Sequence, residues 1–567
     1  MNLSDGFELL ATAPDGVARL RELILSLAVQ GKLVAQDSTD ERAAMLLQKI
    51  RLEKERKIAD KVKREKEQSE ILEEEMPYEL PNGWEWARLA DLTAVLNGRA
   101  YAKHELLNAG IPVLRVGNLF TSKQWYYSDL ELEAEKYCDS GDLLYAWSAS
   151  FGPFIWDGPK AIYHYHIWKL DLHCETCLSK NFLYTFLLEK TQEIKASGHG
   201  IAMLHMTKEK MERIVVPVPP LAEQLRIVAK VDELMRLCDE LETRGRLEGE
   251  RHAQLVATLF NALAASESAH ELAENWARVS AHFDLLLDRP EAVDALEQTI
   301  LQLAVRGLLL PQDPSDEPAK DLLAQIRVRR NSHAGKGKIK HGDPLPEVGN
   351  DDNSFDLPDG WQAIRFGEVW EHSFYGPRFS NDDYVSTGGL PTIRTTDMSG
   401  DRIILKNAPC VQVPDDKREA YLVKKGDLLV TRSGSIGVMA LFDLDLDAIP
   451  SAYLIRIRFV QQVVPAYCLL FLNSPNGKEQ MGLSTTSVGV PNVNATKMAS
   501  FVMPLPPRAE QLRIVARVEE LRRLCADLRE RLNARQTCHA RFAETLVDQV
   551  ALTAPVEENT DDLAAVA

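Results

Sequence analysis

Pro217–Met235 reads PVPPLAEQLRIVAKVDELM, and Pro504–Arg522 repeats it as PLPPRAEQLRIVARVEELR. Of the 19 aligned positions, 14 are identical. Each copy opens with prolines, which lack an N–H donor and restrict the residue before them, so neither copy continues a preceding helix. The sequence therefore predicts that a helix begins directly after Pro220 and again after Pro507.

Behind the prolines, apolar residues recur at intervals of three and four, which predicts a narrow seam along one face of each helix. The helices are expected to run from Leu221 to about Ala265, weakened at Gly245 and Gly249, and from about Arg508 to Val550. Because both seams belong to one chain, each is expected to pack against the other. The predicted seam residues are Ile227, Val231, Leu234, Cys238 and Leu241 in the first copy, and Ile514, Val518, Leu521, Cys525 and Leu528, continuing to Leu532, in the second.

The duplication extends along the whole chain, as a search for internal repeats reveals. The interval between matching segments grows from 276 to 287 positions, which indicates small insertions in the middle of the repeat. The matching pairs are Phe7–Leu10 with Phe283–Leu286, Leu27–Leu33 with Leu303–Leu309, Leu80–Trp84 with Leu357–Trp361, and Gly141–Leu144 with Gly426–Leu429.

Each repeat contains a helical zone, a middle zone of short apolar runs bounded by turn residues, and the seam helix. One helical stretch interrupts each middle zone, which predicts two α+β domains of the same fold. The predicted regions are 1–79 (helical), 80–216 (middle domain), 217–275 (seam helix), 276–354 (second helical region and linker), 355–503 (second middle domain), 504–550 (second seam helix) and 551–567 (acidic, disordered tail).

Within the helical zones, a helix is expected over Leu20–Leu33 with Gly31 as its C-terminal cap. A second helix is expected from Ala43 to about Glu75, with a charge-dense, solvated face. Ser332–Gly342 has the composition of a mobile basic linker.

Composition indicates a globular, cytoplasmic protein: 45% of residues are hydrophobic, 26% are charged, and no apolar run is long enough for a membrane span. The first residues are acidic where a signal peptide would be basic. The eight cysteines are scattered, and two of them, Cys238 and Cys525, fall in the seams, which is typical of reduced thiols.

No catalytic signature is present, since the chain lacks a phosphate-binding glycine loop and the motifs of an adenine methyltransferase. His164, His166, His173, Cys174 and Cys177 form a small cluster that could suggest zinc. It lacks a second ligand pair at suitable spacing, so ordinary histidines are favoured and no metal site is expected.

The segments Gly141–Gly152 and Gly426–Gly437 align without gaps and end in small hydroxylated residues and glycine. Such an end lets backbone approach a ligand closely, although a tight turn would need the same residues. The copies differ where Trp147 in one aligns with Arg432 in the other. A constant backbone with one exchanged side chain is expected of two domains that share a fold but recognise different ligands.

The repeated Pro-x-Pro-Pro-x-Ala-Glu-Gln-Leu-Arg-Ile-Val helix, preceded each time by a Gly-Asp-Leu-Leu…Ser-x-Ser-x-Gly domain, resembles the specificity subunits of type I restriction-modification systems. The resemblance covers nearly the whole chain. It implies two target-recognition domains, at 80–216 and 355–503, separated by spacer helices that pair as an antiparallel coiled coil. It also implies a non-catalytic subunit that reads double-stranded DNA.

The expected partners follow from the resemblance: two modification subunits that methylate adenine, and two restriction subunits in the full complex. S-adenosylmethionine, ATP and Mg would be bound by those partners, and no cofactor by this chain. Net charge is −18, but each recognition domain holds 14 Lys and Arg against 16 Asp and Glu. Near-neutral domains are expected to bind DNA weakly alone, because phosphate neutralisation supplies much of the affinity.

Polar and aromatic residues at the inferred loop tips are the candidate DNA contacts, with arginine the usual reader of guanine. They are Lys103, Arg115, Asn118, Trp147, Ser148 and His205 in the first domain, and Arg378, Arg394, Arg432, Ser433, Ser435 and Asn492 in the second. The alternative is a tandem-repeat scaffold that joins proteins through its helices and ignores DNA.

Overall fold

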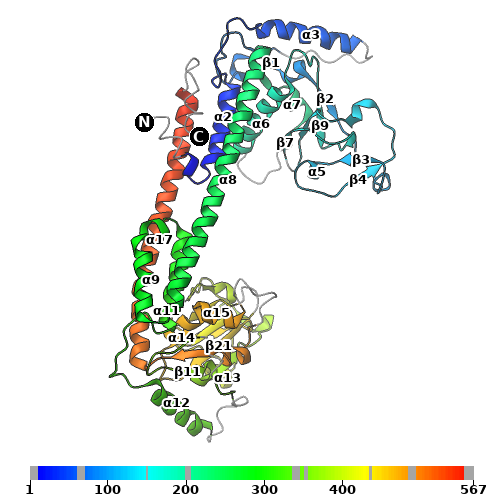
Figure 1. Ribbon diagram of the computed structural model, residues 1–567. Helices are drawn as coiled ribbons and strands as arrows, with labels where there is room; N and C mark the ends of the chain where they lie inside the picture. Colours follow the sequence, from blue (N-terminus) through cyan, green and yellow to red (C-terminus); the bar gives the residue numbers. More distant parts are fainter. Residues whose placement is uncertain are drawn as a thin grey trace. The chain divides into compact units, whose positions relative to one another are not determined.

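A computed structural model describes residues 10–59, 70–148, 151–197, 206–334, 345–349, 355–432, 437–482 and 493–553. The chain forms two compact units, one from Met1–Glu248 with Arg535–Ala567 and one from Gly249–Ala534 (Figure 1). Among the described residues, no helix is long and apolar enough to cross a membrane. The predicted α+β class is confirmed, since each unit combines helices with small antiparallel and mixed sheets.

The first unit begins with α2 (Gly16–Val29), which ends as the sequence predicts. Gly31 follows the helix at φ 70°, and the Lys32 N–H donates to the Leu27 carbonyl at 2.9 Å, the bonding pattern of a glycine cap. The next helix, α3 (Ala43–Ala59), is described only to Ala59. The prediction of a helix reaching Glu75 is wrong at its end, where Glu73–Glu75 forms a single 3-10 turn. Charge density predicted the exposed face of a helix but did not identify its last residue.

The middle domain of the first repeat contains two four-stranded sheets and a two-stranded one. In the first sheet the order is β2-β9-β6-β7, and in the second it is β4-β3-β8-β5, where β3 and β8 pair in parallel. The elements are β1 (Glu85–Arg88), α4 (Leu89–Leu92), β2 (Thr93–Asn97), β3 (Ile111–Leu114), α5 (Val116–Phe120), β4 (Tyr126–Ser128), β5 (Tyr137–Cys138), β6 (Leu143–Ala146), β7 (Gly152–Ile155), β8 (Ala161–Tyr163), β9 (Ile167–Leu172), α6 (Lys180–Ser197), α7 (Lys208–Glu212) and β10 (Val215–Val218).

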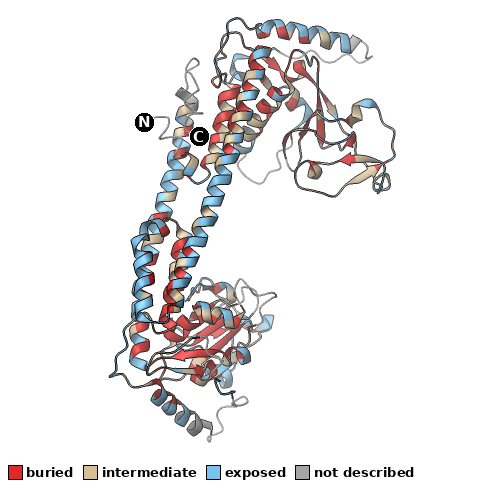
Figure 2. Cartoon of the chain, viewed as in Figure 1, coloured by how far each residue is buried: buried red, intermediate tan, exposed pale blue. Residues whose placement is uncertain are grey.

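The second unit repeats this plan, with sheets ordered β12-β21-β18-β19 and β13-β17-β14-β20. Its sheet strands β18 and β21 are buried, and Figure 2 shows the strands around β21 in red. The elements are α9 (Ala269–Ala281), α10 (Phe283–Leu286), α11 (Pro290–Val305), α12 (Ala319–Ala334), β11 (Gln362–Arg365), β12 (Trp370–Tyr375), β13 (Tyr384–Val385), β14 (Leu390–Ile393), β15 (Met398–Ser399), β16 (Arg402–Ile403), β17 (Cys410–Val411), α13 (Asp415–Tyr421), β18 (Leu428–Thr431), β19 (Met439–Leu441), β20 (Ile449–Pro450), β21 (Leu454–Phe459), α14 (Pro465–Asn473), α15 (Pro475–Met481), α16 (Ala495–Ala499) and β22 (Val502–Leu505).

Two long helices, α8 (Leu221–Ala265) and α17 (Arg508–Thr553), begin directly after the prolines. Helix α8 continues through Gly245 and Gly249, so the glycines do not interrupt it. It ends at Ala265, and α9 starts at Ala269, so the region predicted as 217–275 runs past the spacer helix into the next one. Of the basic linker predicted at 332–342, residues 332–334 belong to α12 and the rest lies outside the described residues, as does the tail from 554.

The two long helices pair antiparallel, as predicted, and their seams are buried, but the prediction that the two seams face each other is wrong. Ile227, Val231, Leu234 and Cys238 share a core with α2 and with Ala543 and Val547 near the end of α17. In the second unit, Ile514, Val518, Cys525 and Leu532 share a core with α11 and with Val256 and Phe260 of α8, while Leu241, Leu521 and Leu528 lie partly buried at the edges of these cores. An antiparallel pair places the start of one helix beside the end of the other, so the two seam segments occupy separate cores.

The repeated Ala-Glu-Gln motif holds each long helix against the middle domain that precedes it. Glu223 is buried, and its Oε2 accepts a hydrogen bond from Trp84 Nε1 at 3.0 Å. Gln224 Oε1 accepts from the Ser179 N–H at 2.7 Å, and its Nε2 donates to the Pro219 carbonyl. The second repeat makes the same set with Glu510, Gln511, Trp361, Val464 and Pro506. The identity of the two copies is therefore explained by packing.

The Arg of the same motif pairs with a carboxylate in the helical zone. Arg226 Nη2 lies 2.7 Å from Asp40 Oδ2, and Arg513 Nη2 lies 2.6 Å from Asp316 Oδ2. Both aspartates are largely buried, with side chains 9% exposed, so each pair fixes the region before the domain to the spacer helix. One short motif thus joins all three zones of its repeat.

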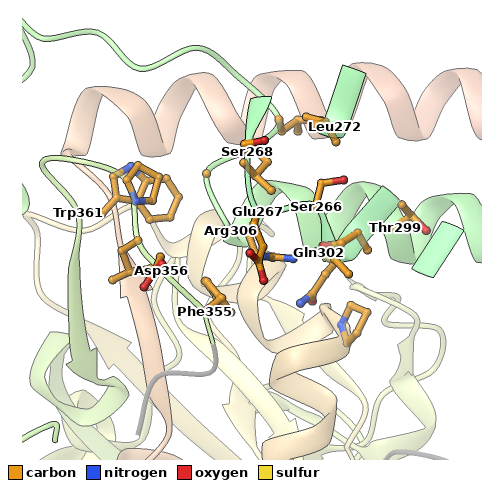
Figure 3. Close-up of a pocket in the computed structure, with 18 of the residues that line it drawn as sticks. Ser266, Glu267, Ser268, Leu272, Thr299, Gln302, Arg306, Phe355, Asp356 and Trp361 are labelled. Carbon is orange, nitrogen blue, oxygen red and sulfur yellow. Dashed lines mark hydrogen bonds between the residues drawn. The ribbon is translucent and has the colours of Figure 1, made fainter. Parts of the chain in front are cut away.

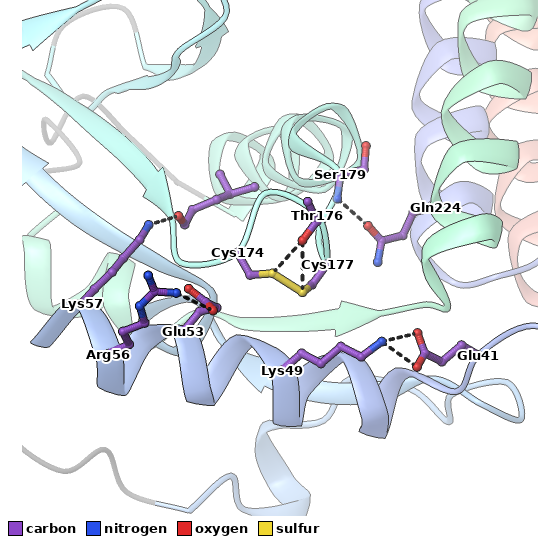
Figure 4. The surroundings of a disulfide bond; sticks show 11 residues. Glu41, Lys49, Glu53, Arg56, Lys57, Cys174, Thr176, Cys177, Ser179 and Gln224 are labelled. Carbon is purple, nitrogen blue, oxygen red and sulfur yellow. Dashed lines mark hydrogen bonds and ion pairs between the residues drawn. A yellow bond between two sulfur atoms is a disulfide. The ribbon is translucent and has the colours of Figure 1, made fainter. Parts of the chain in front are cut away.

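The expectation of reduced thiols is wrong for one pair. Cys174 and Cys177 form a disulfide in the loop between β9 and α6, and both are buried. Figure 4 shows Thr176 beside the two sulfurs. It also shows Ser179, from the same loop as the disulfide, bonded to Gln224 of α8. The corresponding loop of the second domain, 460–464, contains no cysteine. Six other cysteines are free thiols, among them Cys238 and Cys525 in the seams.

Candidate nucleic-acid interface

Three strand ends of the first domain meet at the turn that joins β8 to β9. The His164 N–H donates to the Leu114 carbonyl at the end of β3 (2.9 Å), and the Trp147 N–H beyond β6 donates to the His166 carbonyl (3.1 Å). The Tyr165 N–H donates to the carbonyl of Arg99, just beyond β2, at 3.1 Å. These backbone bonds bring side chains from four separate segments to one place.

The second domain builds the same arrangement from equivalent residues. As in the first domain, the Ser451 N–H donates to the Ile393 carbonyl (2.9 Å) and the Arg432 N–H to the Tyr453 carbonyl (3.0 Å). The Gly376 N–H donates to the Leu454 carbonyl at 3.1 Å, which matches the bond from the Gly98 N–H to the Ile167 carbonyl at 3.3 Å. We call this junction the strand-end platform. It consists of Arg99, Tyr101, Arg115, Tyr126, Trp147 and His164–His166 in the first domain, and of Tyr375, Arg394, Arg432 and Ser451–Tyr453 in the second.

Glycine allows the close backbone approach in both platforms. A Cβ on Gly98 would lie 2.4 Å from the His164 carbonyl oxygen, and one on Gly376 would lie 2.0 Å from that of Ser451. Both distances are far below van der Waals contact, so neither position accepts a side chain without moving the turn. The two domains therefore share a backbone frame in which only the side chains of the platform differ.

In the first domain, Trp147 occupies the centre of the platform. Its indole Nε1 donates to the Tyr165 carbonyl at 2.9 Å, and its ring stacks on Trp168 with centroids 5.6 Å apart. The His166 ring meets it edge-on at 5.1 Å. Since the indole N–H is used within the protein, Trp147 offers a ligand apolar surface rather than a hydrogen-bond donor.

Arginines stacked on tyrosines flank this aromatic centre. The guanidinium of Arg99 lies 5.4 Å from the Tyr101 ring centroid, and that of Arg115 lies 4.3 Å from the centroid of Tyr126. Burial, with smaller contributions from His166 and Arg115, lowers the pKa of His164 to about 4. His164 is therefore neutral at pH 7, and the positive charges at this platform are Arg115 and Arg99, of which Arg99 pairs with Glu105 (Nη2 to Oε1, 2.7 Å).

In the second domain, Arg432 replaces Trp147 at the centre. It is exposed, and its guanidinium lies 5.0 Å from the ring centroid of Tyr375. The Tyr375 hydroxyl accepts a hydrogen bond from the Ala495 N–H at 3.0 Å, which fixes the ring under the arginine. Tyr453, 55% exposed, adjoins Arg432 through the backbone bond. The central side chain of this platform is cationic, where that of the first is aromatic.

Other predicted contacts are occupied by internal bonds. Asn118 Oδ1 accepts from the Arg115 N–H (3.2 Å), while its Nδ2 donates to the Gln124 carbonyl (2.8 Å). Arg394 holds the buried Asp397 with two bonds, Nε to Oδ2 at 2.9 Å and Nη2 to Oδ1 at 2.8 Å, and its pKa is raised chiefly by that bond. Both side chains stabilise the turn after a platform strand.

The remaining predicted residues divide between exposed positions and segments without a description. Lys103 and Arg378 are exposed and remain available to a ligand, and Ser148 is half-buried directly after Trp147. His205, Ser433, Ser435 and Asn492 lie outside the described residues. The tyrosines on which the arginines stack were not predicted from the sequence, because a stacking partner contributed by another strand leaves no local pattern. A tyrosine directly before a glycine at a strand end, as in Tyr375-Gly376, is the one usable signal.

The repeated Gly-Asp-Leu-Leu segment has a structural role. Gly141 and Gly426 adopt φ 89° and 87°, a region that favours glycine. Asp142 pairs with Lys169 (Oδ2 to Nζ, 2.6 Å), and Asp427 pairs with Arg458 (Oδ2 to Nη2, 2.6 Å). The carboxylates thereby join β6 to β9 and β18 to β21 and hold the strands that carry the platforms.

Within the described part of the chain, no group of three His, Cys, Asp or Glu side chains could hold a metal ion. The cysteines of the zinc candidate are joined to each other by the disulfide. Of its histidines, His164 and His166 belong to the platform, with ring centroids 4.9 Å apart.

A cavity of about 1800 Å³ in the second unit is separate from the platform. Arg306 lies in it, donates through Nη1 to the Ala264 carbonyl and stacks on Phe355 at 5.2 Å. Figure 3 shows the Arg306 side chain near Glu267. Burial lowers the pKa of Arg306. Gln30 occupies the equivalent position in the first repeat, so the contact of Arg306 with the end of α8 is specific to the second repeat.

Comparison with known proteins identifies the family of this two-platform chain. A model described as the type I restriction modification DNA specificity domain matches residues 81–249 and 358–535. The chain belongs to this family. The two matched segments each contain one recognition domain together with the start of its spacer helix. The specificity role predicted from the sequence is confirmed at this level, and the scaffold alternative is not favoured.

Curated relatives of the family agree in length. The chain is 32% identical to the type I restriction enzyme EcoEI specificity subunit of Escherichia coli, covering 94% of this chain and 93% of the relative. It is equally similar, at 32% identity with the same coverage, to the EcoAI specificity subunit of the same species. Among solved structures, the HsdS subunit from Thermoanaerobacter tengcongensis covers 84% of this chain and 99% of its own, at 18% identity and a TM-score of 0.40.

Proposed function

We propose that this chain selects an asymmetric, two-part DNA target for a type I restriction-modification complex, with residues 80–216 reading one half and 355–503 the other. The observation that carries the proposal is the pair of strand-end platforms: one backbone frame, built twice, with Trp147 at the centre of one and Arg432 at the centre of the other. Two different readers in one chain would recognise a site without the palindromic symmetry of a homodimer's target.

Platform chemistry supports DNA as the ligand. Arginines stacked on tyrosines keep their fork-shaped donors oriented, and such donors recognise guanine edges and phosphates. Exposed aromatic rings such as those of Tyr165 and Tyr453 can contact bases or sugars. These side chains lie at the ends of strands, where they could reach into a groove of DNA.

The long helices would set the distance between the half-sites. At ~1.5 Å per residue, the 45-residue α8 is ~68 Å long. One turn of DNA spans ~34–36 Å, so such a helix is long enough to separate two readers by more than a turn. The unread bases between the half-sites would then depend on helix length.

We further propose that two copies of a modification subunit dock on the two repeats. Large apolar side chains are exposed at three pairs of equivalent positions, which a solvated surface does not require. These pairs are Leu52 with Val328, Leu225 with Leu512, and Leu255 with Phe542. Restriction subunits would join through the modification subunits, and S-adenosylmethionine, ATP and Mg would be bound by the partners. This chain would contribute specificity without catalysis, and the complex would act on DNA in the cytoplasm.

The near-neutral charge of the recognition domains supports a role for the partners in affinity. With 14 basic against 16 acidic residues in each domain, the isolated subunit should bind DNA weakly and with strong salt sensitivity. Addition of the modification subunits should tighten binding. Nanomolar, sequence-specific binding by the subunit alone at physiological salt would contradict this division of labour.

Methylation sequencing tests the proposal directly. A host that expresses this chain with its modification subunits should carry methylated adenines in one bipartite sequence context. Replacing residues 355–503 with the corresponding domain of a relative should change one half of that context and leave the other half unchanged. A change in both halves would contradict the proposed function, and so would a lack of sequence-selective methylation by the complex with the native chain.

Leu225→Ser and Leu512→Ser test the docking surfaces. Each side chain is exposed, 58% and 49%, so neither substitution should unfold the chain. Each single variant should retain one modification subunit in native mass spectrometry, and the double variant should retain none. As a control, Leu247→Ser alters an exposed α8 leucine whose equivalent in the second repeat is Ala534. Retention of two modification subunits by the double variant would contradict the assignment.

A further inference from the structure

We infer that Arg432 reads a guanine in the half-site of the second domain, and that Trp147 reads the equivalent base pair of the first half-site by apolar contact. This inference rests on the proposed function and adds the chemical class of the base that each platform recognises. The strand-end platforms place the two residues at the same backbone position, each donating its N–H across to the β20–β21 or β8–β9 turn.

The surroundings of Arg432 leave its guanidinium available. Among the described residues, no carboxylate lies within ion-pair distance of it, and its guanidinium carbon lies 5.0 Å from the ring centroid of Tyr375. Stacking on a ring does not use the N–H donors at the edge of the guanidinium plane. A guanidinium in this state can donate two parallel bonds to O6 and N7 of guanine, an arrangement that no other base offers in the major groove.

Tyr375 is itself held in place, so the fork of Arg432 is oriented before DNA binds. The hydroxyl accepts from the Ala495 N–H at the start of α16, and the next residue, Gly376, contacts the Ser451 turn too closely for a side chain. A side chain ordered in advance loses less conformational freedom on binding, which increases the affinity gained per bond.

Arg394, the other arginine of this platform, has its donors occupied, and this contrast identifies Arg432 as the residue that recognises the base. Arg394 follows strand β14, which pairs with β20 in the other sheet, but both of its bonded nitrogens donate to Asp397, a residue only 4% exposed. A guanidinium neutralised in this way has its fork occupied. Of the two arginines in the second platform, Arg432 is the one that is exposed and has no ion pair among the described residues.

Trp147 cannot make the same contact. Its single donor is bonded to the Tyr165 carbonyl, and its ring is stacked on Trp168. What remains accessible is hydrocarbon, which suits the C5-methyl group of thymine and gives no bidentate recognition of guanine. The two half-sites should therefore differ at this equivalent base pair: G·C under Arg432 and a thymine-containing pair under Trp147.

The test compares Arg432→Ala and Arg432→Lys in the intact complex with its modification subunits. Lysine keeps the positive charge for phosphate but loses the fork, so it separates base reading from charge. Methylation is measured on a DNA library in which every position of both half-sites carries each of the four bases. Arg418→Ala, which removes an exposed arginine paired with Asp447 in the same domain, is the matched control.

Both Arg432 variants should lose discrimination, by about 5- to 150-fold, at a single guanine of one half-site. Only the alanine variant should also lose overall affinity, and Arg418→Ala should leave every position unchanged. Tyr375→Leu, which removes the stacking face at a half-exposed site, should relax the same position less strongly. Trp147→Ala should relax one position of the other half-site, at a thymine.

Full discrimination by Arg432→Lys, or relaxation at a base pair other than G·C, would overturn the inference while leaving the proposed function intact. Failure of the unmodified complex to methylate any bipartite sequence would instead overturn the proposed function. Because Arg432 is exposed, loss of folding is not an expected result, and circular dichroism of each variant checks that the domain is intact.

Discussion

Glu223 offers a sharp test of how the repeated motif holds the first unit together. Its side chain is buried, with Oε2 accepting from Trp84 Nε1 (3.0 Å) and Oε1 accepting from Gln36 Nε2 (2.6 Å). Glu223→Ala would leave the buried Trp84 Nε1 without this acceptor, at ~1–3 kcal/mol, and would remove one acceptor of the half-buried Gln36 amide, which also donates to the Gly31 carbonyl at 3.5 Å. We therefore expect the free energy of unfolding of the first unit to fall by roughly 1–3 kcal/mol.

Glu223→Gln should have a smaller effect, and that effect should depend on pH. Burial raises the pKa of Glu223 to about 7, against the opposing bond from Trp84. A carboxyl whose folded pKa lies above its unfolded value of 4.5 contributes stability that is fully present below that value and is lost as the pH rises through the folded pKa. Glutamine does not titrate, so the variant should lose less stability than the native chain between pH 5 and pH 8.

Urea unfolding of the full chain at pH 5 and pH 8, followed by tryptophan fluorescence, measures both effects. Glu510→Ala and Glu510→Gln provide the matched pair in the second repeat, where Trp361 Nε1 donates to Glu510 at 2.9 Å and burial likewise raises the carboxyl pKa. Each alanine variant should weaken the transition of its own unit. Equal losses for alanine and glutamine, or a glutamine effect that is the same at both pH values, would refute the reasoning.

Three other predictions follow from the structure. His372 accepts a hydrogen bond from Arg456, and burial together with the charge of Arg456 lowers the pKa of His372 below 6.5. The stability that neutral His372 contributes to the second unit should therefore be present above pH 6.5 and be lost as the pH falls through the lowered pKa. NMR titration of His372 checks this, and a normal pKa would contradict it. Replacing Cys174 and Cys177 with serine should lower the stability of the first unit by about 2 kcal/mol, measured by urea unfolding, and a reductant should have the same effect on the native chain. Inserting four residues after Arg244 should lengthen α8 by ~6 Å, and methylation sequencing should show about two more unread base pairs; an unchanged spacer would contradict the proposed dependence on helix length.

Much of the fold could be predicted because the information is local and occurs twice. Prolines followed by a three-four apolar spacing predicted where α8 and α17 begin, and Gly31 predicted the cap of α2. These patterns reflect backbone preferences within a few residues, and the duplication tested each one a second time. The end of α3 and the Cys174–Cys177 bond had no such second copy, and both predictions there were wrong.

The candidate site was predicted in part. Alignment of the repeats singled out Trp147 against Arg432, and the structure places both at the centres of equivalent platforms. It could not distinguish Arg394, whose fork is bonded to Asp397, from Arg432, whose fork is open, because both are arginines directly after a strand. The tyrosines that orient the arginines were missed for a related reason, since each comes from a different strand.

The sequence by itself determined the duplicated plan, the family and the positions at which the two readers differ. Only the tertiary structure decided which surfaces meet: the seam of α8 with α2 and the end of α17, and the ends of β2, β3 and β6 with the β8–β9 turn. Periodicity records which face of an element is buried but not what covers it. That choice depends on hydrogen bonds and packing between residues far apart in the chain, which no local pattern encodes.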